Sequence, residues 1–527
     1  MSRIAIRSFA DIRAALLARE ELALLDVREE APFAEGHPLF AANIPLSRLE
    51  IEVYARVPRR SVPVTVYDDG EGLAERAAER LLALGYRDVA LLEGGLAGWR
   101  AAGGELFIDV NVPSKAFGEL VEAERHTPSL AAEEVKALLD AKADVVVLDA
   151  RRFDEYQTMS IPGGISVPGA ELVLRVRELA PNPQTRVIVN CAGRTRSIIG
   201  TQSLVNAGIP NAVAALRNGT IGWTLADQQL EQGQSRRFPE VSAENRALAA
   251  QSARVVADRA GVGRASLADL ARWREEAGRT TYLFDVRTPE EYEAGHLPGA
   301  RSTPGGQLVQ ETDHFASVRG ARLVLVDDDG VRANMSASWL AQMGWEVHVL
   351  DGLGAAEFAE RGGWSAPVPP APQSEDIAPE TLQDWLAEGD TLVLDFTTSA
   401  NYVKRHIPGA WWALRAQLPQ ALEKLPPAQR YVVTCGSSLL ARYAVDELQA
   451  LTGKPAFVLA GGTVAWIAAG LPLEEGESAL AVPGSDRYRR PYEGTDNPRE
   501  AMQAYLDWEF GLVEQLGRDG THGFFVI

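Results

Sequence analysis

One sequence pattern occurs four times along this chain of 527 residues, and the repetition constrains the fold more than any other feature. In each copy an apolar run ends in Asp, and an acidic segment with an aromatic residue follows it. The four strand ends are Leu24–Arg28, Val147–Arg151, Leu283–Arg287 and Val393–Thr397. Such internal repetition indicates that the chain uses one folding unit several times.

Each copy contains a second apolar run, and a turn and a helical segment follow it. These runs are residues 64–67, 187–190, 323–326 and 431–434. Short apolar strands that alternate with helical segments predict βαβ units and a mostly parallel sheet covered on both faces. We therefore expect an α/β protein whose ligands bind at the carboxyl ends of the strands.

The chain has only two cysteines, Cys191 and Cys435, and each follows one of these second strands and begins a turn of small residues. Backbone N–H groups converge there and the helix dipole is positive, so we expect the thiolate form to be favoured. Two cysteines far apart in the sequence make a poor disulfide framework, and we expect a cytoplasmic location.

The composition excludes several classes of partner. A net charge of −20 argues against nucleic acid and anionic membranes. No apolar run is long enough to span a bilayer, and residues 1–7 lack the apolar stretch of a signal peptide. No His/Cys cluster has metal-ligand spacing and no glycine-rich nucleotide loop is present, so we expect neither metal nor cofactor.

These residues resemble the rhodanese (sulfurtransferase) family in four tandem copies. The resemblance rests on the Asp-x-Arg strand end, a His-x-Pro-Gly-Ala turn (residues 296–300 and 406–410), the cysteine loop, and a glycine turn before tryptophan (residues 94–99 and 461–466). It implies four three-layer α/β/α domains, each with a mostly parallel five-stranded sheet. It also implies that the loop cysteine carries a persulfide.

We expect rhodanese-like domains over residues 3–106, 124–233, 263–366 and 374–476, and a docking tail without assigned chemistry over residues 477–527. Aligning the second strands places Asp68 and Asp328 where the other two copies have cysteine, so we interpret the first and third domains as structural. The order resembles two inactive/active pairs in series, joined through residues 234–262.

Cys191 is the expected catalytic residue. The donor-binding loop is expected to comprise Ala192, Gly193, Arg194, Thr195 and Arg196. The two arginines would lower the thiol pKa and bind an anionic donor such as thiosulfate, and surface salt bridges are the alternative. By the resemblance Asp149 and Arg151 organise the site, although a strand-end salt bridge is equally compatible with them.

Cys435 is the expected second catalytic residue, with Gly436, Ser437 and Ser438 as its binding loop. The loop carries no charge and resembles the Cys-Gly-Ser loop of mercaptopyruvate sulfurtransferases, although Leu439 and Leu440 depart from that pattern. Its hydroxyl groups would bind a neutral or carbonyl-bearing donor, and Arg442 would reach the site. A thiol retained for packing is the alternative.

Other conspicuous residues are interpreted as structural. The histidines of the Pro-Gly turns are expected to hold the turns, because they also occur in copies without cysteine. The tryptophans of the glycine turns are expected to pack in the core or at its rim, with Trp223 as a wall of the pocket. The acidic turn Asp327–Gly330 is interpreted as solvated, and a phosphate or metal site is the alternative.

The predicted function is transfer of a sulfane sulfur from thiosulfate or a persulfide donor to cyanide or a thiol, through a Cys191 persulfide. Two alternatives stay open. A cysteine phosphatase would use a Cys-x5-Arg loop, whereas Cys191 and Arg196 form Cys-x4-Arg. A scaffold or sensor would use the four copies as an interaction array. The sequence makes no prediction of the oligomeric state.

Overall fold

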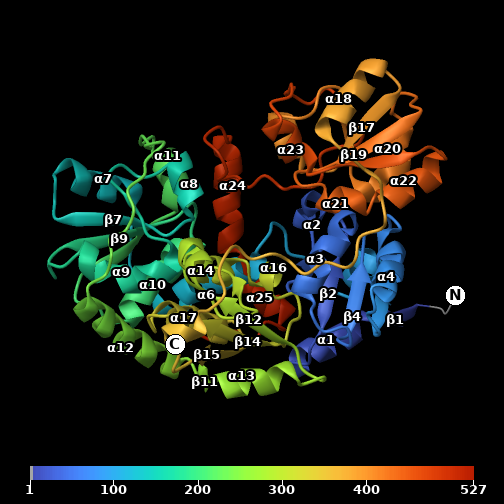
Figure 1. The fold of residues 1–527 in the computed structure, drawn as a ribbon. Helices are drawn as coiled ribbons and strands as arrows, with labels where there is room; N and C mark the ends of the chain where they lie inside the picture. The colour runs from blue at the N-terminus through green and yellow to red at the C-terminus, as the bar shows by residue number, and fades with distance from the viewer. Residues whose placement is uncertain (1–3) are drawn as a thin grey trace.

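The computed structural model describes residues 4–527 and contains four five-stranded sheets (Figure 1). Every sheet has the same strand order, with β1-β5-β4-β2-β3 in the first copy and the equivalent order in the others. All strand pairs within these sheets are parallel, and helices cover the faces. The predicted α/β fold with four parallel five-stranded sheets is confirmed.

The first two copies are joined by one long helix. The first contains β1 (Ala5–Arg7), α1 (Phe9–Ala18), β2 (Ala23–Asp26), α2 (Glu30–Glu35), β3 (Ala42–Asn43), η1 (Leu46–Arg48), α3 (Leu49–Arg56), β4 (Val64–Tyr67), α4 (Leu73–Ala83), β5 (Val89–Leu92) and α5 (Gly95–Ala101). The joining helix is α6 (Val112–Arg125). The second contains β6 (Ser129–Leu130), α7 (Ala132–Asp140), β7 (Val145–Asp149), α8 (Phe153–Thr158), β8 (Ile165–Ser166), η2 (Gly169–Glu171), α9 (Leu172–Leu179), β9 (Arg186–Asn190), α10 (Thr195–Asn206), β10 (Val213–Leu216) and α11 (Gly219–Leu225).

Helix α12 (Ala243–Arg259) leads to the third copy. That copy contains β11 (Gly263–Ala265), α13 (Leu267–Arg274), β12 (Thr281–Asp285), α14 (Pro289–Ala294), β13 (Arg301–Ser302), α15 (Gly305–Gln310), α16 (Thr312–Phe315), β14 (Arg322–Val326), α17 (Arg332–Gln342), β15 (Glu346–Leu350) and η3 (Ala355–Glu357). The fourth contains β16 (Asp376–Ile377), α18 (Pro379–Glu388), β17 (Thr391–Asp395), α19 (Ser399–Lys404), β18 (Trp411–Trp412), η4 (Arg415–Gln417), α20 (Leu418–Leu422), β19 (Arg430–Thr434), α21 (Leu439–Arg442), α22 (Val445–Thr452), β20 (Ala456–Leu459) and α23 (Gly462–Ala468). The tail adds α24 (Arg499–Phe510) and α25 (Leu512–Asp519).

The central strands are buried on both faces, which explains their continuous apolar runs. Their register fixes which residues are equivalent between copies. The last pairs of the two central strands are Asp26–Tyr67, Asp149–Asn190, Asp285–Val326 and Asp395–Thr434. The next residues are therefore Asp68, Cys191, Asp327 and Cys435. The sequence alignment, which chose Asp328, was wrong by one residue because it lacked this strand pairing.

The four copies do not pack in sequence order. In the second and third copies η2 packs against α15, with Gly306 so close to Gly169 that an added Cβ would lie 3.1 Å from the Gly169 nitrogen. The equivalent elements η1 and η4 join the first copy to the fourth, where Ala416 N–H donates to Ser47 Oγ at 3.1 Å. Each pair still combines a copy that has an Asp loop with a copy that has a Cys loop. The second copy pairs with the third and the first pairs with the fourth, whereas the sequence predicted pairs of consecutive copies.

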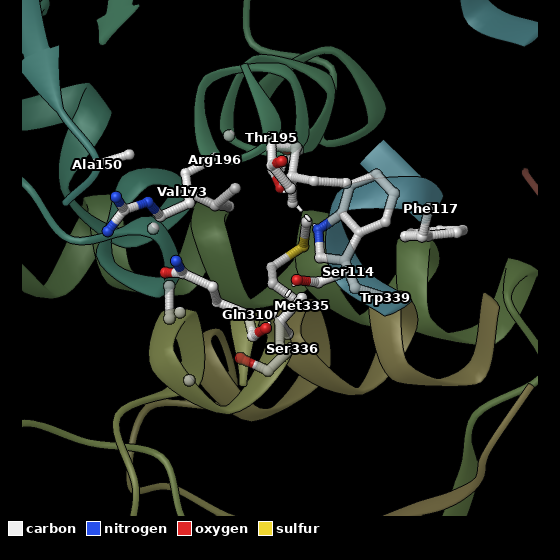
Figure 2. A pocket seen from close by; sticks show the side chains of 18 residues that line it. Ser114, Phe117, Ala150, Val173, Thr195, Arg196, Gln310, Met335, Ser336 and Trp339 are labelled. Carbon is white, nitrogen blue, oxygen red and sulfur yellow. Dashed lines mark hydrogen bonds between the residues drawn. The ribbon is translucent and has the colours of Figure 1, made fainter. Parts of the chain in front are cut away.

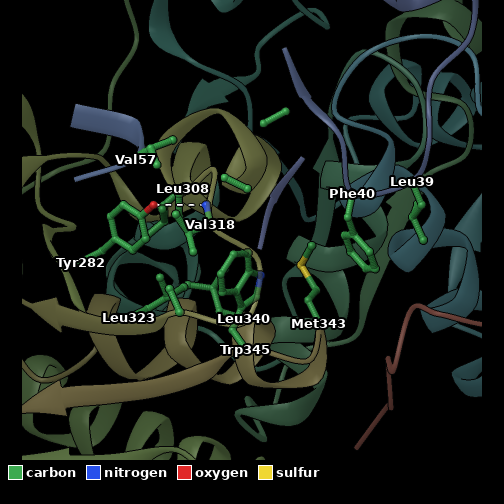
Figure 3. Close-up of a cluster of buried hydrophobic side chains, with 14 of the residues drawn as sticks. Leu39, Phe40, Val57, Tyr282, Leu308, Val318, Leu323, Leu340, Met343 and Trp345 are labelled. Atoms are coloured by element: carbon green, nitrogen blue, oxygen red, sulfur yellow. Dashed lines mark hydrogen bonds between the residues drawn. The ribbon is translucent and has the colours of Figure 1, made fainter. Parts of the chain in front are cut away.

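The first and third copies share one hydrophobic core (Figure 3). Leu39, Phe40 and Val57 of the first copy belong to the same buried cluster as Tyr282 and Trp345 of the third. Phe524, close to the C-terminus, lies between Phe40 and Phe117 of α6. The first and third copies therefore bury apolar side chains against each other in one contiguous cluster.

Helix α24 of the tail lies between the second copy and the fourth, and α25 packs against α6 (Figure 1). Among residues 4–527 there is no helix with the length and apolar character needed to cross a membrane.

Candidate active site

In all four equivalent loops, the backbone N–H six residues after the central side chain interacts with that side chain. In the first copy Asp68 accepts hydrogen bonds from the N–H groups of Gly70 at 3.1 Å, Leu73 at 2.6 Å and Ala74 at 3.0 Å. A carboxylate thus occupies the centre of the loop. The loop is an anion-binding nest even where it has no cysteine.

The third copy repeats this arrangement. Asp327 accepts hydrogen bonds from the N–H groups of Gly330 at 3.2 Å and Ala333 at 2.8 Å. Its neighbour Asp329 pairs with Arg332 at 2.6 Å. The acidic turn is therefore held by amides and an arginine, and the prediction of a merely solvated turn was wrong. No group of metal-ligating side chains occurs in the described part of the chain.

Cys435 occupies the same place as these aspartates in the fourth copy. The backbone N–H groups of Ser438, Leu440 and Ala441 act on its sulfur and favour the thiolate. Burial is the larger effect and raises the pKa of the thiol, and the Asp395 charge adds to it. The loop amides therefore offset part of the cost of a buried anion.

Cys191 is 2% exposed and lies between β9 and α10. Its Sγ lies 3.4 Å from Ser197 Oγ, and burial raises the pKa of the thiol. Arg196 and the Ser197 amide act in the opposite direction but do not compensate. The expectation that the position by itself favours thiolate was wrong for both cysteines, because it neglected the desolvation of the buried sulfur.

The backbone around Cys191 is fixed by the following glycine turn. Thr220 N–H donates to the Cys191 carbonyl at 2.9 Å, and Ile221 N–H donates to the Ala192 carbonyl at 3.0 Å. Gly219, with φ +55°, lies so close that an added Cβ would collide with the Cys191 carbonyl oxygen. This close approach requires glycine at the position.

We expect Gly219→Ala to destabilise the protein by at least about 1 kcal/mol, because it adds strain at positive φ and displaces the cysteine loop. Thermal unfolding and the rate of Cys191 alkylation measure the two effects. Gly208→Ala is the matched control, since its φ is +67° and no atom lies within 4 Å of its added Cβ. Equal unfolding temperatures and equal alkylation rates in both variants would show that the cysteine loop does not depend on the close approach of Gly219 to the Cys191 carbonyl.

The two loop arginines have different surroundings. Arg196 donates to Glu155 at 2.7 and 2.9 Å, and against the effect of burial this pair lowers the pKa of Glu155 to about 2. Arg196 remains close enough to Cys191 for its charge to lower the thiol pKa. Thr195 and Arg196 are partly exposed, whereas Ala192, Gly193 and Arg194 are buried.

Arg194 points away from the sulfur. Its guanidinium donates to Glu119 at 2.7 and 2.9 Å and to Glu122, and it lies 4.3 Å from the ring centre of Phe510. It is buried at 5% exposure. The salt-bridge alternative therefore describes Arg194, although the pair is buried and not on the surface.

Asp149 and Arg151 form a buried ion pair with contacts of 2.9 and 2.7 Å, and Asn190 also donates to Asp149. The same pair occurs as Asp26–Arg28 and Asp285–Arg287 in the copies without cysteine. The geometry thus favours the strand-end salt bridge over a role in substrate binding.

The fourth copy lacks this arginine, and Thr397 stands in its place. Asp395 Oδ2 has no hydrogen-bond partner, and burial raises the pKa of Asp395 to about 7. Arg442 pairs with Asp376 at 2.7 Å, so the expectation that it reaches Cys435 was wrong. Arg48 of the first copy lies close enough for its charge to interact with Cys435.

Ser438 of the Cys435 loop is buried, has φ +65°, and its Oγ has no hydrogen-bond partner. Ser437 is exposed and accepts a hydrogen bond from Leu439 N–H at 3.4 Å, and Gly436 is half-buried. A cavity of 440 Å³ between the first and fourth copies reaches this loop at Leu440 and is lined by Arg48.

Several cavities adjoin the second copy, and two of them are lined by Arg196. One of 40 Å³ lies between α10 and the third copy and is lined by Thr195, Arg196, Gln310 and Trp339 (Figure 2). It is much smaller than the other cavities around the second copy. Another cavity, of 360 Å³, is lined by Arg196 and Glu290. A third, of 380 Å³, is lined by Glu155 and Tyr492.

The tail covers the Cys191 loop, which the sequence did not predict. A Cβ added to Gly193 would lie 3.1 Å from Tyr505 Cε1 and 3.3 Å from Glu509 Oε2. Thr195 Oγ1 lies 3.5 Å from Glu509 Oε1. The only sequence signal was the aromatic and helical character of the segment, which gave no partner.

The remaining conspicuous residues stabilise turns and cores. His296 and His406 stack on tyrosine rings at 3.8 Å and bond to the carbonyls of the same tyrosines. Trp223 is fully buried and donates to the Gln229 carbonyl at 2.8 Å. It packs in the core, so the suggestion that it walls the pocket was wrong.

Comparison with known proteins agrees with this geometry. A family model described as "Rhodanese-like domain" matches residues 10–102, 131–226, 266–358 and 378–469. A thiosulfate sulfurtransferase of Azotobacter vinelandii is 28% identical over 211 residues, which are 36% of this chain and 76% of that protein. Another, of Pseudomonas aeruginosa, is 29% identical over 223 residues, 34% of this chain and 80% of that protein.

A crystal structure of a thiosulfate sulfurtransferase from Pseudomonas aeruginosa is 80% identical in sequence and matches with a TM-score of 0.99. The match covers 99% of this chain and 100% of that chain. The family model covers more than half of the residues here. The chain therefore belongs to the rhodanese family and is a sulfurtransferase built of four rhodanese-like domains.

Proposed function

We propose that the protein transfers a sulfane sulfur from thiosulfate or a persulfide donor to cyanide or a thiol, through a persulfide on Cys191. The observation that supports this most is the loop geometry. Two loops hold an aspartate side chain among inward-facing amides, and the other two place a cysteine at the same position. A persulfide is an anion of the kind that such a nest stabilises.

The reaction with thiosulfate is balanced without a redox partner. The Cys191 thiolate attacks the outer sulfur, one S–S bond forms, the S–S bond of thiosulfate breaks, and sulfite leaves with the electron pair. The persulfide then gives its terminal sulfur to cyanide or a thiolate, and Cys191 leaves as thiolate. Thiolate is the reactive form in both directions.

Arg196 supports an anionic donor because it lies at the loop and lines a cavity of 360 Å³. Relatives named thiosulfate sulfurtransferase support thiosulfate as that donor. Cys435, with its uncharged loop, is the second proposed site. We assign the Asp68 and Asp327 domains a structural role, because a carboxylate cannot accept a sulfane sulfur. Both cysteines are free, in keeping with a reducing cytoplasm.

Mass spectrometry of the intact protein and its peptides tests the proposal. After exposure to thiosulfate, the peptide that contains Cys191 should gain one sulfur atom, and cyanide should remove it as thiocyanate. Mercaptopyruvate, tested in the same way, distinguishes a donor for the Cys435 loop. Absence of added sulfur on either cysteine with both donors would contradict the proposal.

We expect Arg196→Ala to raise the KM for thiosulfate at least about tenfold, because a charge-assisted contact to an anion contributes roughly 1.5–3 kcal/mol. Arg194→Ala should instead lower the melting temperature, since it leaves Glu119 buried without its partner. Steady-state kinetics and thermal unfolding separate the two effects. An unchanged KM for thiosulfate in Arg196→Ala would mean that the donor binds elsewhere.

A further inference from the structure

We infer that Glu509 of the tail is a further residue of the Cys191 site, and that in its acid form it donates a hydrogen bond to the anionic sulfur held by the loop. The inference deepens the proposed function, because it concerns the same cysteine. It assigns chemistry to a segment outside the four repeated domains.

The geometry directs one carboxyl oxygen of Glu509 to the loop. The Tyr505 hydroxyl donates to Oε1 at 3.0 Å, and Thr195 Oγ1 lies 3.5 Å from the same atom. Oε2 is buried, has no hydrogen-bond partner, and lies on the side of Gly193. An unpartnered polar atom in a fully buried side chain costs free energy unless a ligand supplies the partner.

The surroundings of Glu509 favour the acid form. Burial, followed by the charge of Glu119, raises the pKa of Glu509 to about 8. Lys115 and Arg194 oppose this effect, but they already pair with Asp109 and Glu119. The ionisable groups that face Glu509 come from three elements and are Tyr505 of α24, Lys115 and Glu119 of α6, and Arg194 and Cys191 of the loop.

The two protonation states of Glu509 have opposite effects on sulfur chemistry. Below about pH 8 the acid donates its proton as a hydrogen bond from Oε2 while Oε1 accepts from Tyr505. This arrangement stabilises a thiolate or persulfide. Above that pH the carboxylate repels the anionic sulfur, which agrees with the contribution of Glu509 to the raised pKa of the Cys191 thiol.

Alkylation of Cys191 by iodoacetamide across pH, followed on its peptide by mass spectrometry, tests the inference without any sulfur donor. Glu509→Gln keeps a hydrogen-bond donor and removes the charge, so the midpoint of the rate profile should fall by about one pH unit. Glu509→Ala removes both, and its midpoint should lie above that of Glu509→Gln. Glu500→Gln, an exposed position of the same helix, is the matched control and should coincide with the unmodified protein.

If the alkylation rate profile of Glu509→Gln has the same midpoint as that of the control, the inference is overturned. Identical midpoints for Glu509→Gln and Glu509→Ala would also overturn it. Tyr505→Phe provides a second measurement if the Glu509 variants do not fold. It removes the hydrogen bond that lowers the pKa of Glu509, so Glu509 stays in the acid form to higher pH and the midpoint of the Cys191 rate profile should fall. An unchanged midpoint would contradict the inference. Thiosulfate titration of the unmodified protein is a separate test, and failure of thiosulfate to bind would overturn only the proposed donor.

Discussion

Cys191→Ser should lower thiosulfate-dependent formation of thiocyanate by at least about 1,000-fold, because loss of a nucleophile removes the covalent route and not merely a contact. Serine cannot carry a sulfane sulfur, and its hydroxyl is a far weaker nucleophile than thiolate. The substitution is nearly isosteric in a position that is 2% exposed, so the fold should persist. Steady-state release of thiocyanate measures the effect.

Cys435→Ser is the matched comparison, since the equivalent atom of the equivalent loop is changed. With thiosulfate as donor, we expect the Cys435→Ser variant to retain more than half of the turnover of the unmodified protein. The reverse result, with turnover lost in Cys435→Ser and kept in Cys191→Ser, would assign the carrier to the fourth copy. Circular dichroism of both variants shows whether each retains its fold.

Arg332→Ala should destabilise the protein by about 3–5 kcal/mol, the cost of leaving buried charges without their partner. Arg332 is 1% exposed and pairs with Glu171 at 2.9 Å, Glu291 at 2.5 Å and Asp329 at 2.6 Å. Glu171 belongs to the second copy, so the effect should appear at the contact of the second copy with the third. Guanidinium unfolding and hydrogen exchange of residues 169–171 measure it.

The same cluster of charges around Arg332 predicts that the stability of the protein depends on pH. Against the effect of burial, Arg332 lowers the pKa of Glu291 from 4.5 to about 2. This contribution to stability is complete above the unfolded pKa and is lost as the pH falls from about 4.5 towards 2. Arg254→Ala is the control, since its pair with Asp351 is exposed and should contribute less than about 1 kcal/mol. Equal unfolding midpoints for the two variants would contradict the prediction.

The sequence predicted the repeated fold because each strand run and glycine turn is local. Residues 64–67 and 187–190 are mostly apolar and are buried on both faces, and such a run predicts a buried parallel strand. The position of Cys191 at a strand end followed from the same pattern. The choice of Asp328 failed because strand register depends on the pairing of Asp285 with Val326, which is a contact between separate segments.

The site was only partly predictable, for the same reason. Arg194 and Arg196 look alike in the sequence, but α6 supplies Glu119 to one and α8 supplies Glu155 to the other. The pKa of Cys191 could not be inferred either, because its desolvation depends on which segments cover the loop. The covering residues Tyr505 and Glu509 lie more than 300 residues from the cysteine along the chain.

By itself the sequence determined that four parallel sheets form and that two of their loops carry a thiol, since strands, turns and helix starts follow from neighbouring residues. Tertiary structure alone decided that η1 of the first copy packs against η4 of the fourth, and that η2 of the second copy packs against α15 of the third. It also decided that the tail covers Cys191. These features depend on burial and charge pairing between distant segments, whose free energies no local pattern encodes.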